Sequence, residues 1–266
     1  DARHKLHGVV VSQILPLRKY AYIDPETVEN VRHSAYFFGG ATRPGGQEGW
    51  VDYVPAYFSE LPMLIRRNMT PADVVFAIVS PMDEYGYFSL SLGPDYTMAA
   101  VEKARAVVLE VNPNVPFANG NCHIHISQVA ALTESNDPLF EVGLPKIGPV
   151  QEAIGAHVAE MIPDGATLQI GYGGIPDAVV MQLTNKHNLG VHTEMVGDGI
   201  MTLVEAGVID NSRKNVNRGK MLATFALGSK KLYDFINRNP SVEMHPVDTT
   251  NDPFLAGQND NLHCIN

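Results

Sequence analysis

Two short segments of the sequence combine residue types and spacings that could do chemistry. One is a glycine turn that follows an apolar run and reads Gly171-Tyr172-Gly173-Gly174-Ile175-Pro176. Glycines let a backbone approach a ligand closely, and a helix that begins after such a turn offers unpaired N–H groups to an anion or a developing oxyanion. The glycine turn is therefore a candidate ligand site. Its alternative is a tight strand-to-helix connection that binds nothing.

The glycine turn also matches part of the fingerprint of dinucleotide-binding folds. Gly171 and Gly173 correspond to its first two glycines, and Glu194 lies near the position, about 20 residues further on, where a ribose-binding acid is expected. Pro176 stands in place of the third glycine, which that fold needs for close packing of helix against strand. A dinucleotide site therefore stays an alternative that rests on a weak match.

The second segment is residues 189–199, which contains Glu194. On an extended strand, Val191 and Thr193 would point to one side, and His192 and Glu194 would point to the other. A carboxylate at the end of a buried strand is costly unless it is paired or used. Glu194 is therefore a candidate functional residue, and the alternative is that it caps a turn or pairs with a nearby cation.

The rest of the chain predicts the elements that must position these two segments. Short apolar runs bounded by turn residues predict strands at 8–15, 72–80, 104–111, 166–170 and 221–227. The runs do not alternate with polar residues, which is typical of strands buried on both faces of a mostly parallel sheet. Helical spacing over 150–162, and a helix start at Asp24-Pro25, alternate with these strands. This alternation predicts an α/β fold.

A Pro/Gly-rich stretch at residues 144–149 predicts a boundary between two α/β domains, residues 1–145 and 146–266. Both ends of the chain interrupt strand-like segments. The sequence begins without Met just ahead of Val9-Val10-Val11, and it stops at residues 261–266, which predict a strand with nothing after it. We therefore expect the natural protein to be longer than this chain at both ends.

Composition argues against several classes of protein. A formal net charge of −10 over 266 residues leaves no basic surface for a nucleic-acid backbone. No apolar stretch approaches the ~20 residues of a membrane span, so we expect no membrane segment. The only cysteines are Cys122 and Cys264, far apart in the sequence, which favours a reducing, cytoplasmic setting.

A metal site is not expected. His123 and His125 could be two ligands on one strand face, but no third ligand follows at a spacing typical of zinc. Polar strand residues that face a cleft or a partner subunit are the preferred interpretation. Asp198 lies between two glycines and is interpreted as a turn residue rather than an acid catalyst.

The glycine turn, taken together with Gly190-Val191-His192-Thr193-Glu194-Met195, resembles the 4-hydroxybutyrate CoA-transferase / acetyl-CoA hydrolase family, which includes butyryl-CoA:acetate CoA-transferases. Three further segments are similar to that family and occur in the expected order: residues 80–89, 95–97 and 247–253. The resemblance covers nearly the whole chain. It implies two similar open α/β domains with mostly parallel sheets, of the CoA-transferase (NagB/RpiA-like) fold. The family's first strand–turn–helix unit is missing before Asp1, and its glycine-rich segments continue past Asn266.

The resemblance also implies roles for individual residues. Glu194 falls on the glutamate that forms a covalent glutamyl–CoA thioester. The loop that borders the CoA thioester falls on Gly171, Tyr172, Gly173, Gly174 and Ile175. Tyr172 and Gly174 replace residues that are more often aliphatic or small in the family. We expect this difference to alter the acyl pocket but to leave the backbone conformation of the glycine turn unchanged.

The implied activity is ping-pong transfer of coenzyme A between a short-chain acyl-CoA, of the 4-hydroxybutyryl-CoA or butyryl-CoA class, and a carboxylate such as acetate. No prosthetic group is expected, because coenzyme A enters as a substrate, and we expect a cytoplasmic homodimer. One alternative is an acyl-CoA hydrolase on the same scaffold, which would need no carboxylate acceptor. Another is a dinucleotide-binding α/β module without catalysis.

Overall fold

The computed structural model describes residues 5–143 and 145–266, and the chain divides into two compact units. Unit 1 is Asp1–Phe58 and unit 2 is Ser59–Asn266. The boundary predicted near residue 145 falls inside unit 2, and the division into domains 1–145 and 146–266 stays a prediction. Leu144, part of the predicted linker, lies outside the described residues.

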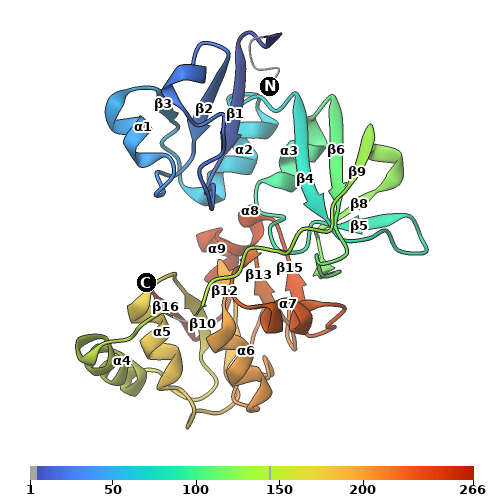
Figure 1. Ribbon diagram of the computed structural model, residues 1–266. Helices are drawn as coiled ribbons and strands as arrows, with labels where there is room; N and C mark the ends of the chain where they lie inside the picture. The colour runs from blue at the N-terminus through green and yellow to red at the C-terminus, as the bar shows by residue number, and fades with distance from the viewer. Residues whose placement is uncertain (1–4, 144) are drawn as a thin grey trace. The chain divides into compact units, whose positions relative to one another are not determined.

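Unit 1 is a small α/β unit built on a three-stranded parallel sheet (Figure 1). The strand order follows the chain: β1 (Val9–Gln13), β2 (Val31–Ala35) and β3 (Val51–Tyr53), with the helical segments η2 (Pro25–Thr27) and α1 (Arg43–Glu48) between them. Its core consists of Ile23, Ala35 and Val51, each at most 5% exposed.

The helix start predicted at Asp24 is correct, but the helix is a single 3₁₀ turn. The Asp24 carboxylate accepts a hydrogen bond from the Glu26 amide at 3.0 Å, as an N-cap does. The Thr27 hydroxyl then donates to the Tyr22 carbonyl at 2.8 Å. Such local side-chain bonds compete with helix propagation, and the chain turns into β2 instead.

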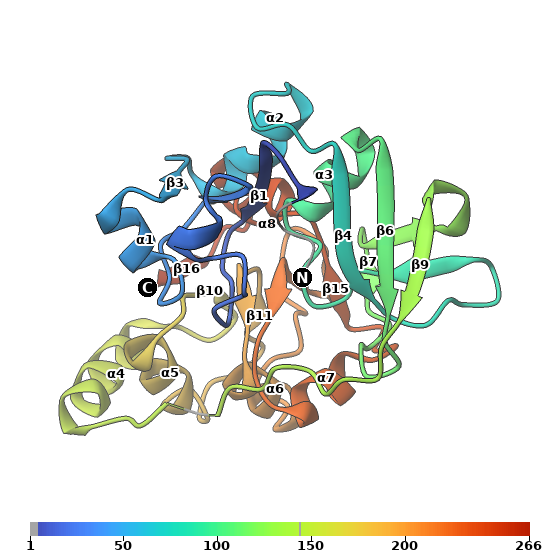
Figure 2. The same cartoon turned by 45° about the horizontal axis from the view of Figure 1, so that its top comes forward.

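Unit 2 contains short strands in several small sheets, with helices packed against them (Figures 1 and 2). The sheets have the orders β4-β6-β9, β13-β15-β7, β11-β10-β16, β12-β14 and β5-β8; the last pair is antiparallel and the others are parallel. The strand bounds are β4 (Val74–Val79), β5 (Tyr87–Ser89), β6 (Ala106–Val111), β7 (Asn119–Gly120), β8 (His123–His125), β9 (Ala131–Glu134), β10 (Thr167–Ile170), β11 (Gly190–Val191), β12 (Met195–Val196), β13 (Met221–Ala223), β14 (Phe225–Ala226), β15 (Val242–Met244) and β16 (Leu262–Ile265).

The helices are short, and α4, with 13 residues, is the longest in the described part of the chain. Their bounds are η3 (Phe58–Glu60), α2 (Leu61–Arg66), α3 (Thr97–Lys103), η4 (Ile126–Gln128), α4 (Pro149–Met161), α5 (Gly174–Met181), α6 (Asp198–Glu205), α7 (Lys230–Ile236), α8 (Val247–Thr250) and α9 (Pro253–Ala256). Within residues 5–143 and 145–266, none of these helices has the length and apolar character needed to cross a membrane.

The α/β class predicted from the sequence is confirmed, and most of the sheet pairing is parallel as expected. The strands expected from the apolar runs are present as β1, β4, β6 and β10. The run 221–227 differs, because it is divided into β13 and β14 by a break at Thr224. The helix expected over 150–162 is α4, which begins one residue earlier because Gly148 is its N-cap and Pro149 its first residue.

Burial on both faces was expected for every apolar strand, and for β4 this is wrong. Val75 and Val79 are buried on one face of β4, whereas Phe76 on the other face is 79% exposed. For β13 the expectation is correct, since all three of its residues are buried. An apolar run thus indicates that a strand can be covered on both faces, but the residues of unit 2 cover only one face of β4.

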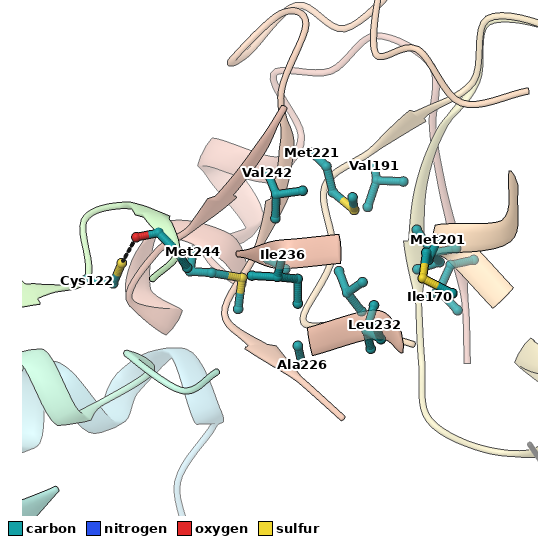
Figure 3. Packing of buried hydrophobic residues seen from close by; sticks show 14 of the residues in the cluster. Cys122, Ile170, Val191, Met201, Met221, Ala226, Leu232, Ile236, Val242 and Met244 are labelled. Atoms are coloured by element: carbon teal, nitrogen blue, oxygen red, sulfur yellow. Dashed lines mark hydrogen bonds between the residues drawn. The ribbon is translucent and has the colours of Figure 1, made fainter. Parts of the chain in front are cut away.

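The core of unit 2 joins the strands of its second half to helix α7 (Figure 3). The strands and the helix contribute side chains that are at most 1% exposed: Val191, Met221, Val242 and Met244 from the strands, and Leu232 and Ile236 from α7. This apolar packing fixes the strand order, and the strand order decides which chain segments meet at the carboxyl ends of the strands.

Helices α4 and α5 lie side by side in close contact (Figures 1 and 2). Gly155 of α4 makes this approach possible, because a Cβ atom there would lie 2.8 Å from both the carbonyl carbon and the carbonyl oxygen of Ala178. Since α5 begins within the glycine turn, the contact at Gly155 helps to hold that turn in place.

Replacing Gly155 with Val should destabilise the protein, because backbone atoms of α5 cannot move away as a flexible side chain could. Overpacking of this kind typically costs about 1–3 kcal/mol, which corresponds to a fall in Tm of several degrees. The matched control is Ala156→Val in the same helix, where the side chain is exposed and only helix propensity changes. Equal melting temperatures for the two variants in a calorimetric scan would contradict the close contact.

Candidate functional site

The glycine turn and the Glu194 segment emerge at the same edge of one sheet. Strands β10 and β11 are parallel, with Thr167 opposite Gly190 and Leu168 opposite Val191. The glycine turn follows β10, and Glu194 lies beyond the end of β11. Because ligands bind outside the carboxyl ends of parallel strands, this edge is the candidate functional site.

Glu194 lies at a break between two short strands. β11 ends at Val191 and β12 begins at Met195. In the gap, the Glu194 carbonyl accepts hydrogen bonds from the amides of Thr224 and Phe225, each at 3.0 Å. The backbone of Glu194 is therefore held by the adjacent chain segment, while its half-buried side chain leaves the sheet at a point where the regular strand is interrupted.

One oxygen of the Glu194 carboxylate is held by a side chain from a distant part of the chain. The Asn251 amide group donates a hydrogen bond to Glu194 Oε2 at 2.5 Å, and the Thr250 hydroxyl donates to Asn251 Oδ1 at 2.9 Å, which fixes the orientation of the amide. Burial raises the pKa of Glu194 above its usual value, and the hydrogen bond from Asn251 opposes this rise.

Thr193 joins the Glu194 segment to the strand that leads into the glycine turn. The Thr193 hydroxyl donates to the Ile170 carbonyl at 2.9 Å and accepts from the Ile170 amide at 2.9 Å. Ile170 is the last residue of β10, directly before Gly171. This pair of bonds replaces the strand ladder beyond Leu168 and keeps the two candidate segments together.

Gly171 marks the closest approach of the glycine turn to the end of the chain. Its amide donates to the Ile265 carbonyl at 2.7 Å, and a Cβ atom there would lie 2.5 Å from Asn266 Oδ1 and 3.1 Å from Asn266 Cα. Because Gly171 has no Cβ atom, its backbone can pack closely against Asn266, the residue that follows β16.

Gly173 is required for a different reason. Its backbone has φ +142° and ψ 173°, a conformation that is essentially restricted to glycine, and it leads into α5. Space around Gly173 is open, because the nearest neighbour of a Cβ atom at this position would be Pro176 Cδ at 4.0 Å. The neighbouring Tyr172 is 69% exposed. The turn therefore presents an accessible backbone at the start of a helix.

Ile175 lies at helical spacing from Val179 and Leu183 but is not buried with them. Val179 and Leu183 are fully buried, whereas Ile175 is 39% exposed because it lies in the first turn of α5.

The alternation of sides expected for the Glu194 segment agrees with the contacts of residues 192–194. His192 and Glu194 both reach the segment 250–251, whereas Thr193 reaches Ile170. Both sides of this segment are covered, since Val191, His192 and Thr193 are all buried.

His192 is a buried structural link rather than a charged group. One ring nitrogen is 3.0 Å from the Thr250 carbonyl, and the other is 3.3 Å from the Asn259 amide nitrogen. Burial, together with the nearby positive charge of Lys214, lowers the pKa of His192 to about 4. The imidazole is therefore neutral near pH 7, and its contact with Thr250 holds the segment that presents Asn251.

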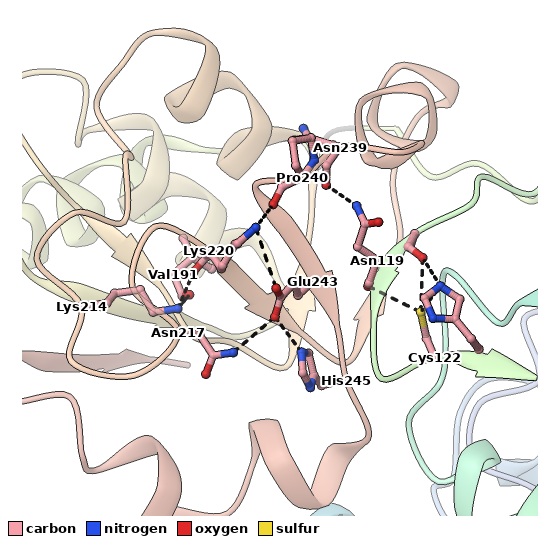
Figure 4. A network of polar contacts seen from close by, with 12 residues as sticks. Asn119, Cys122, Val191, Lys214, Asn217, Lys220, Asn239, Pro240, Glu243 and His245 are labelled. Atoms are coloured by element: carbon pink, nitrogen blue, oxygen red, sulfur yellow. Dashed lines mark hydrogen bonds and ion pairs between the residues drawn. The ribbon is translucent and has the colours of Figure 1, made fainter.

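Lys214 is a buried residue of this region that was not expected from the sequence (Figure 4). Its ammonium group donates to the carbonyls of Val191 at 2.8 Å and Lys220 at 2.6 Å. Burial lowers the pKa of Lys214 to about 7. Gly190 makes room for its side chain, because a Cβ atom there would lie 2.5 Å from Lys214 Cγ. The sequence did not indicate this burial, because the neighbours of Lys214 in the sequence are polar and predict a solvent-exposed loop.

The polar network continues to the strand that precedes Asn251 (Figure 4). The Glu243 carboxylate on β15 accepts from Asn217 at 3.3 Å and contacts His245 at 3.0 Å. His245 follows β15, and α8 and Asn251 follow it in turn. The network therefore positions the chain segment that brings Asn251 to Glu194.

Family models match two stretches of the chain. A model of the acetyl-CoA hydrolase/transferase N-terminal domain matches residues 4–142, more than half of the chain, and a model of the corresponding C-terminal domain matches residues 228–266. The chain belongs to the acetyl-CoA hydrolase/transferase family. This confirms the family expected from the glycine turn and the Glu194 segment. Glu194 itself lies between the two matched stretches.

Individual members of this family are similar to the chain over most of its length. It is 47% identical, over 99% of its residues, to the succinyl-CoA:cyclohexane-1-carboxylate CoA transferase of Geobacter metallireducens, and 45% identical, over 97%, to the 4-hydroxybutyrate coenzyme A transferase of Clostridium kluyveri. In both comparisons it spans 60% of the relative's length. The crystal structure of a 4-hydroxybutyrate CoA-transferase from Porphyromonas gingivalis is 36% identical, with a TM-score of 0.84 over 98% of this chain and 69% of that one.

Other polar residues considered from the sequence lie in structural contacts. Asp198 is the first residue of α6 and accepts a hydrogen bond from the Ser229 amide at 2.9 Å, so it joins two helices rather than a simple turn. His123 is 2.9 Å from the Ala118 carbonyl, and His125 is 2.8 Å from the Ser127 hydroxyl. The described residues contain no group of three or more His, Cys, Asp or Glu that could hold a metal ion.

Replacing Asn251 with Ala should raise the pKa of Glu194 further, because burial then acts without the opposing hydrogen bond. Asn251→Asp should raise it more, since a second carboxylate repels the ionised form. The carboxyl ¹³C shift of Glu194, followed against pH in protein labelled at glutamate, measures this pKa directly. Asn215→Ala is the control, because Asn215 bonds to Asp260 instead. An unchanged or lower pKa in the Asn251 variants would show that the hydrogen bond does not stabilise the carboxylate.

Replacing Gly173 with Ala should destabilise the protein by about 1–3 kcal/mol, the usual cost of forcing a non-glycine residue into such a conformation. Gly174→Ala is the matched control, because its φ is not positive and a Cβ atom would make an ordinary contact of 3.8 Å with Gln151. Thermal unfolding should show a lower Tm for the first variant alone. Similar values for both would mean that the turn relaxes without cost.

Proposed function

We propose that this chain carries the catalytic centre of a CoA-transferase and that Glu194 is its nucleophile. The observation that carries the proposal is the placement of one half-buried carboxylate, held by Asn251, at the sheet edge where the glycine turn also emerges. The relatives named above are CoA-transferases, which supports the same activity here.

The first half of the reaction uses Glu194 as a carboxylate. One oxygen attacks the carbonyl carbon of the acyl-CoA, a C–O bond forms, and the C–S bond breaks, so that CoA leaves as a thiolate and an acyl–glutamyl anhydride remains. The thiolate then attacks the glutamyl carbonyl carbon. An S–C bond forms, the bond between the glutamyl carbon and the bridging oxygen breaks, and that oxygen leaves with the acyl group as the carboxylate of the first acid.

The second half reverses these steps with another acid. Its carboxylate attacks the glutamyl–CoA thioester, and the thiolate released returns to the new acyl group. A carboxylate nucleophile suits this exchange because attack and departure are nearly balanced at each step. Burial supports the chemistry in two ways: it strengthens the nucleophile by limiting its hydration, and it keeps water from hydrolysing the thioester.

The glycine turn is proposed to border the CoA thioester through Gly171, Tyr172, Gly173, Gly174 and Ile175. The N-terminus of α5 carries no side-chain cap, so its first amides are free to face a developing oxyanion. The exposed side chains of Tyr172 and Ile175 would then lie beside the thioester and contribute to the acyl pocket.

The substrates are proposed to be a short-chain acyl-CoA of the 4-hydroxybutyryl-CoA or butyryl-CoA class and a carboxylate such as acetate, without a prosthetic group. We further propose a NagB/RpiA-like fold with two similar domains, 1–145 and 146–266, in a cytoplasmic homodimer. A second candidate function is hydrolysis of acyl-CoA, favoured by the family description, which names hydrolases beside transferases. Dependence on a carboxylate acceptor separates the two.

Incubating the whole natural protein with acyl-CoA and no acceptor should leave CoA attached to Glu194 as a thioester. Borohydride reduces thioesters but not carboxylates, so it should convert Glu194 to an alcohol and abolish activity permanently, as mass spectrometry of peptides would show. Glu194→Gln should give neither adduct nor transfer. Glu194→Asp should be almost as inactive, because misplacement by about 1 Å can cost 10²-fold in rate.

Glu160→Gln, at an exposed position on α4, is the control and should behave as the unmodified protein does. Adding acetate should release the adduct as acetyl-CoA from a transferase, whereas a hydrolase would lose its adduct to water without any acceptor. If the CoA adduct were found on another residue, or if transfer occurred without any adduct, Glu194 would have a structural or ribose-binding role instead.

A further inference from the structure

The hydroxyl group of Thr224 is buried without a hydrogen-bond partner. The residue is 0% exposed, and its Oγ1 atom contacts no donor or acceptor among the described residues. Buried hydroxyls are nearly always paired, because removing one from water without compensation is unfavourable. Such an exception calls for a physical explanation.

Thr224 is the in-register neighbour of Glu194 on the adjacent chain segment. On one side of the strand break His192 pairs with Leu222, and on the other side Met195 pairs with Phe225, so the same register continues across the gap. The Thr224 amide also donates directly to the Glu194 carbonyl at 3.0 Å. Thr224 is the single residue between β13 and β14, and it lies opposite Glu194, the last residue of the gap between β11 and β12.

The other unpaired polar atoms of the described chain do not share this placement. They belong to His33, which lies in unit 1, and to Thr70 and Ser91, neither of which is in register with Glu194. Thr224 is therefore the unpaired hydroxyl that lies against the proposed nucleophile.

The burial of the Thr224 hydroxyl limits the groups that can form a hydrogen bond with it. Thr224 Oγ1 is closed to solvent, so a diffusing ligand cannot reach it, whereas the side chain of Glu194 starts from the facing backbone position. In the resting arrangement Asn251 holds Glu194 Oε2, and Thr224 takes no part. A hydrogen bond that is absent in the ground state and forms later lowers the barrier instead of stabilising the resting enzyme.

We propose that Thr224 is a further catalytic residue: its hydroxyl donates a hydrogen bond to the glutamyl carbonyl oxygen while Glu194 is an anhydride or a thioester. This rests on the proposed function. As the CoA thiolate attacks the glutamyl carbon, the S–C bond forms and the carbonyl electron pair moves onto oxygen, where Thr224 donates. When the pair returns, the C–O bond to the first acid breaks and the acid leaves as a carboxylate. Thr224 keeps its proton throughout.

Thr224→Val tests the proposal, because it removes the hydroxyl and keeps the shape. We expect kcat to fall about 10- to 100-fold, the range for one hydrogen bond to a charged acceptor, with little change in KM. The Tm should be unchanged or higher, since an unpaired buried hydroxyl is lost. Thr70→Val is the matched control: it removes another unpaired hydroxyl and should leave the kinetics unchanged.

A second pair of variants keeps the test decisive should the Val protein fail to fold. Thr224→Ser and Thr224→Ala differ by the hydroxyl alone, so Ser should retain kcat and Ala should lose it. The infrared carbonyl band of the trapped glutamyl–CoA thioester should shift to higher frequency in Thr224→Ala, because a hydrogen bond is lost.

The outcomes separate this proposal from the proposed function. If Glu194 is labelled by CoA and the Val and Ala variants match the unmodified protein in kcat and in carbonyl frequency, Thr224 is structural and the proposal fails while the nucleophile stands. If the unmodified protein forms no adduct at Glu194, the proposed function fails first, and the role of Thr224 fails with it.

Discussion

The hydrogen bond between Asn251 and Glu194 is the constraint on which the rest of the site depends. Taking a carboxylate partly out of water favours its protonated form, and a donor aimed at one oxygen opposes that tendency. The proposed chemistry needs both effects, because a solvated carboxylate is a weak nucleophile and a protonated one is none. The contacts around the site can be understood as the means of keeping this single donor in place.

Those contacts come from both sides of Glu194. On one side, His192 holds the Thr250 carbonyl and so fixes the segment that ends in Asn251. On the other side, Thr193 joins the strand to Ile170 and thereby to the glycine turn. Three consecutive residues thus serve three different partners. The alternation of an extended segment explains this, because it directs His192 and Glu194 to the segment 250–251 and Thr193 to Ile170.

The sequence was sufficient to predict the parts of the site that depend on local patterns. An apolar run followed by glycines and then Pro176 indicates a strand, a turn and a helix, and the structure contains all three. Asn251 could not be predicted as a partner of Glu194 from these patterns, because 57 residues separate the two and their contact follows from strand order. The burial of Lys214 was missed for the same reason, since its polar neighbours in sequence are not its neighbours in space.

The distribution of charge around Glu194 follows from this burial. The Lys214 ammonium of the network does not pair with the carboxylate, because it donates to the carbonyls of Val191 and Lys220. Its charge adds to the effect of burial in keeping His192 neutral. Had His192 been protonated, an imidazolium two residues before Glu194 would stabilise the carboxylate and weaken it as the proposed nucleophile. Burial is the larger cause of the low pKa of His192 and the charge of Lys214 adds to it, so together they keep a cation away from the proposed nucleophile.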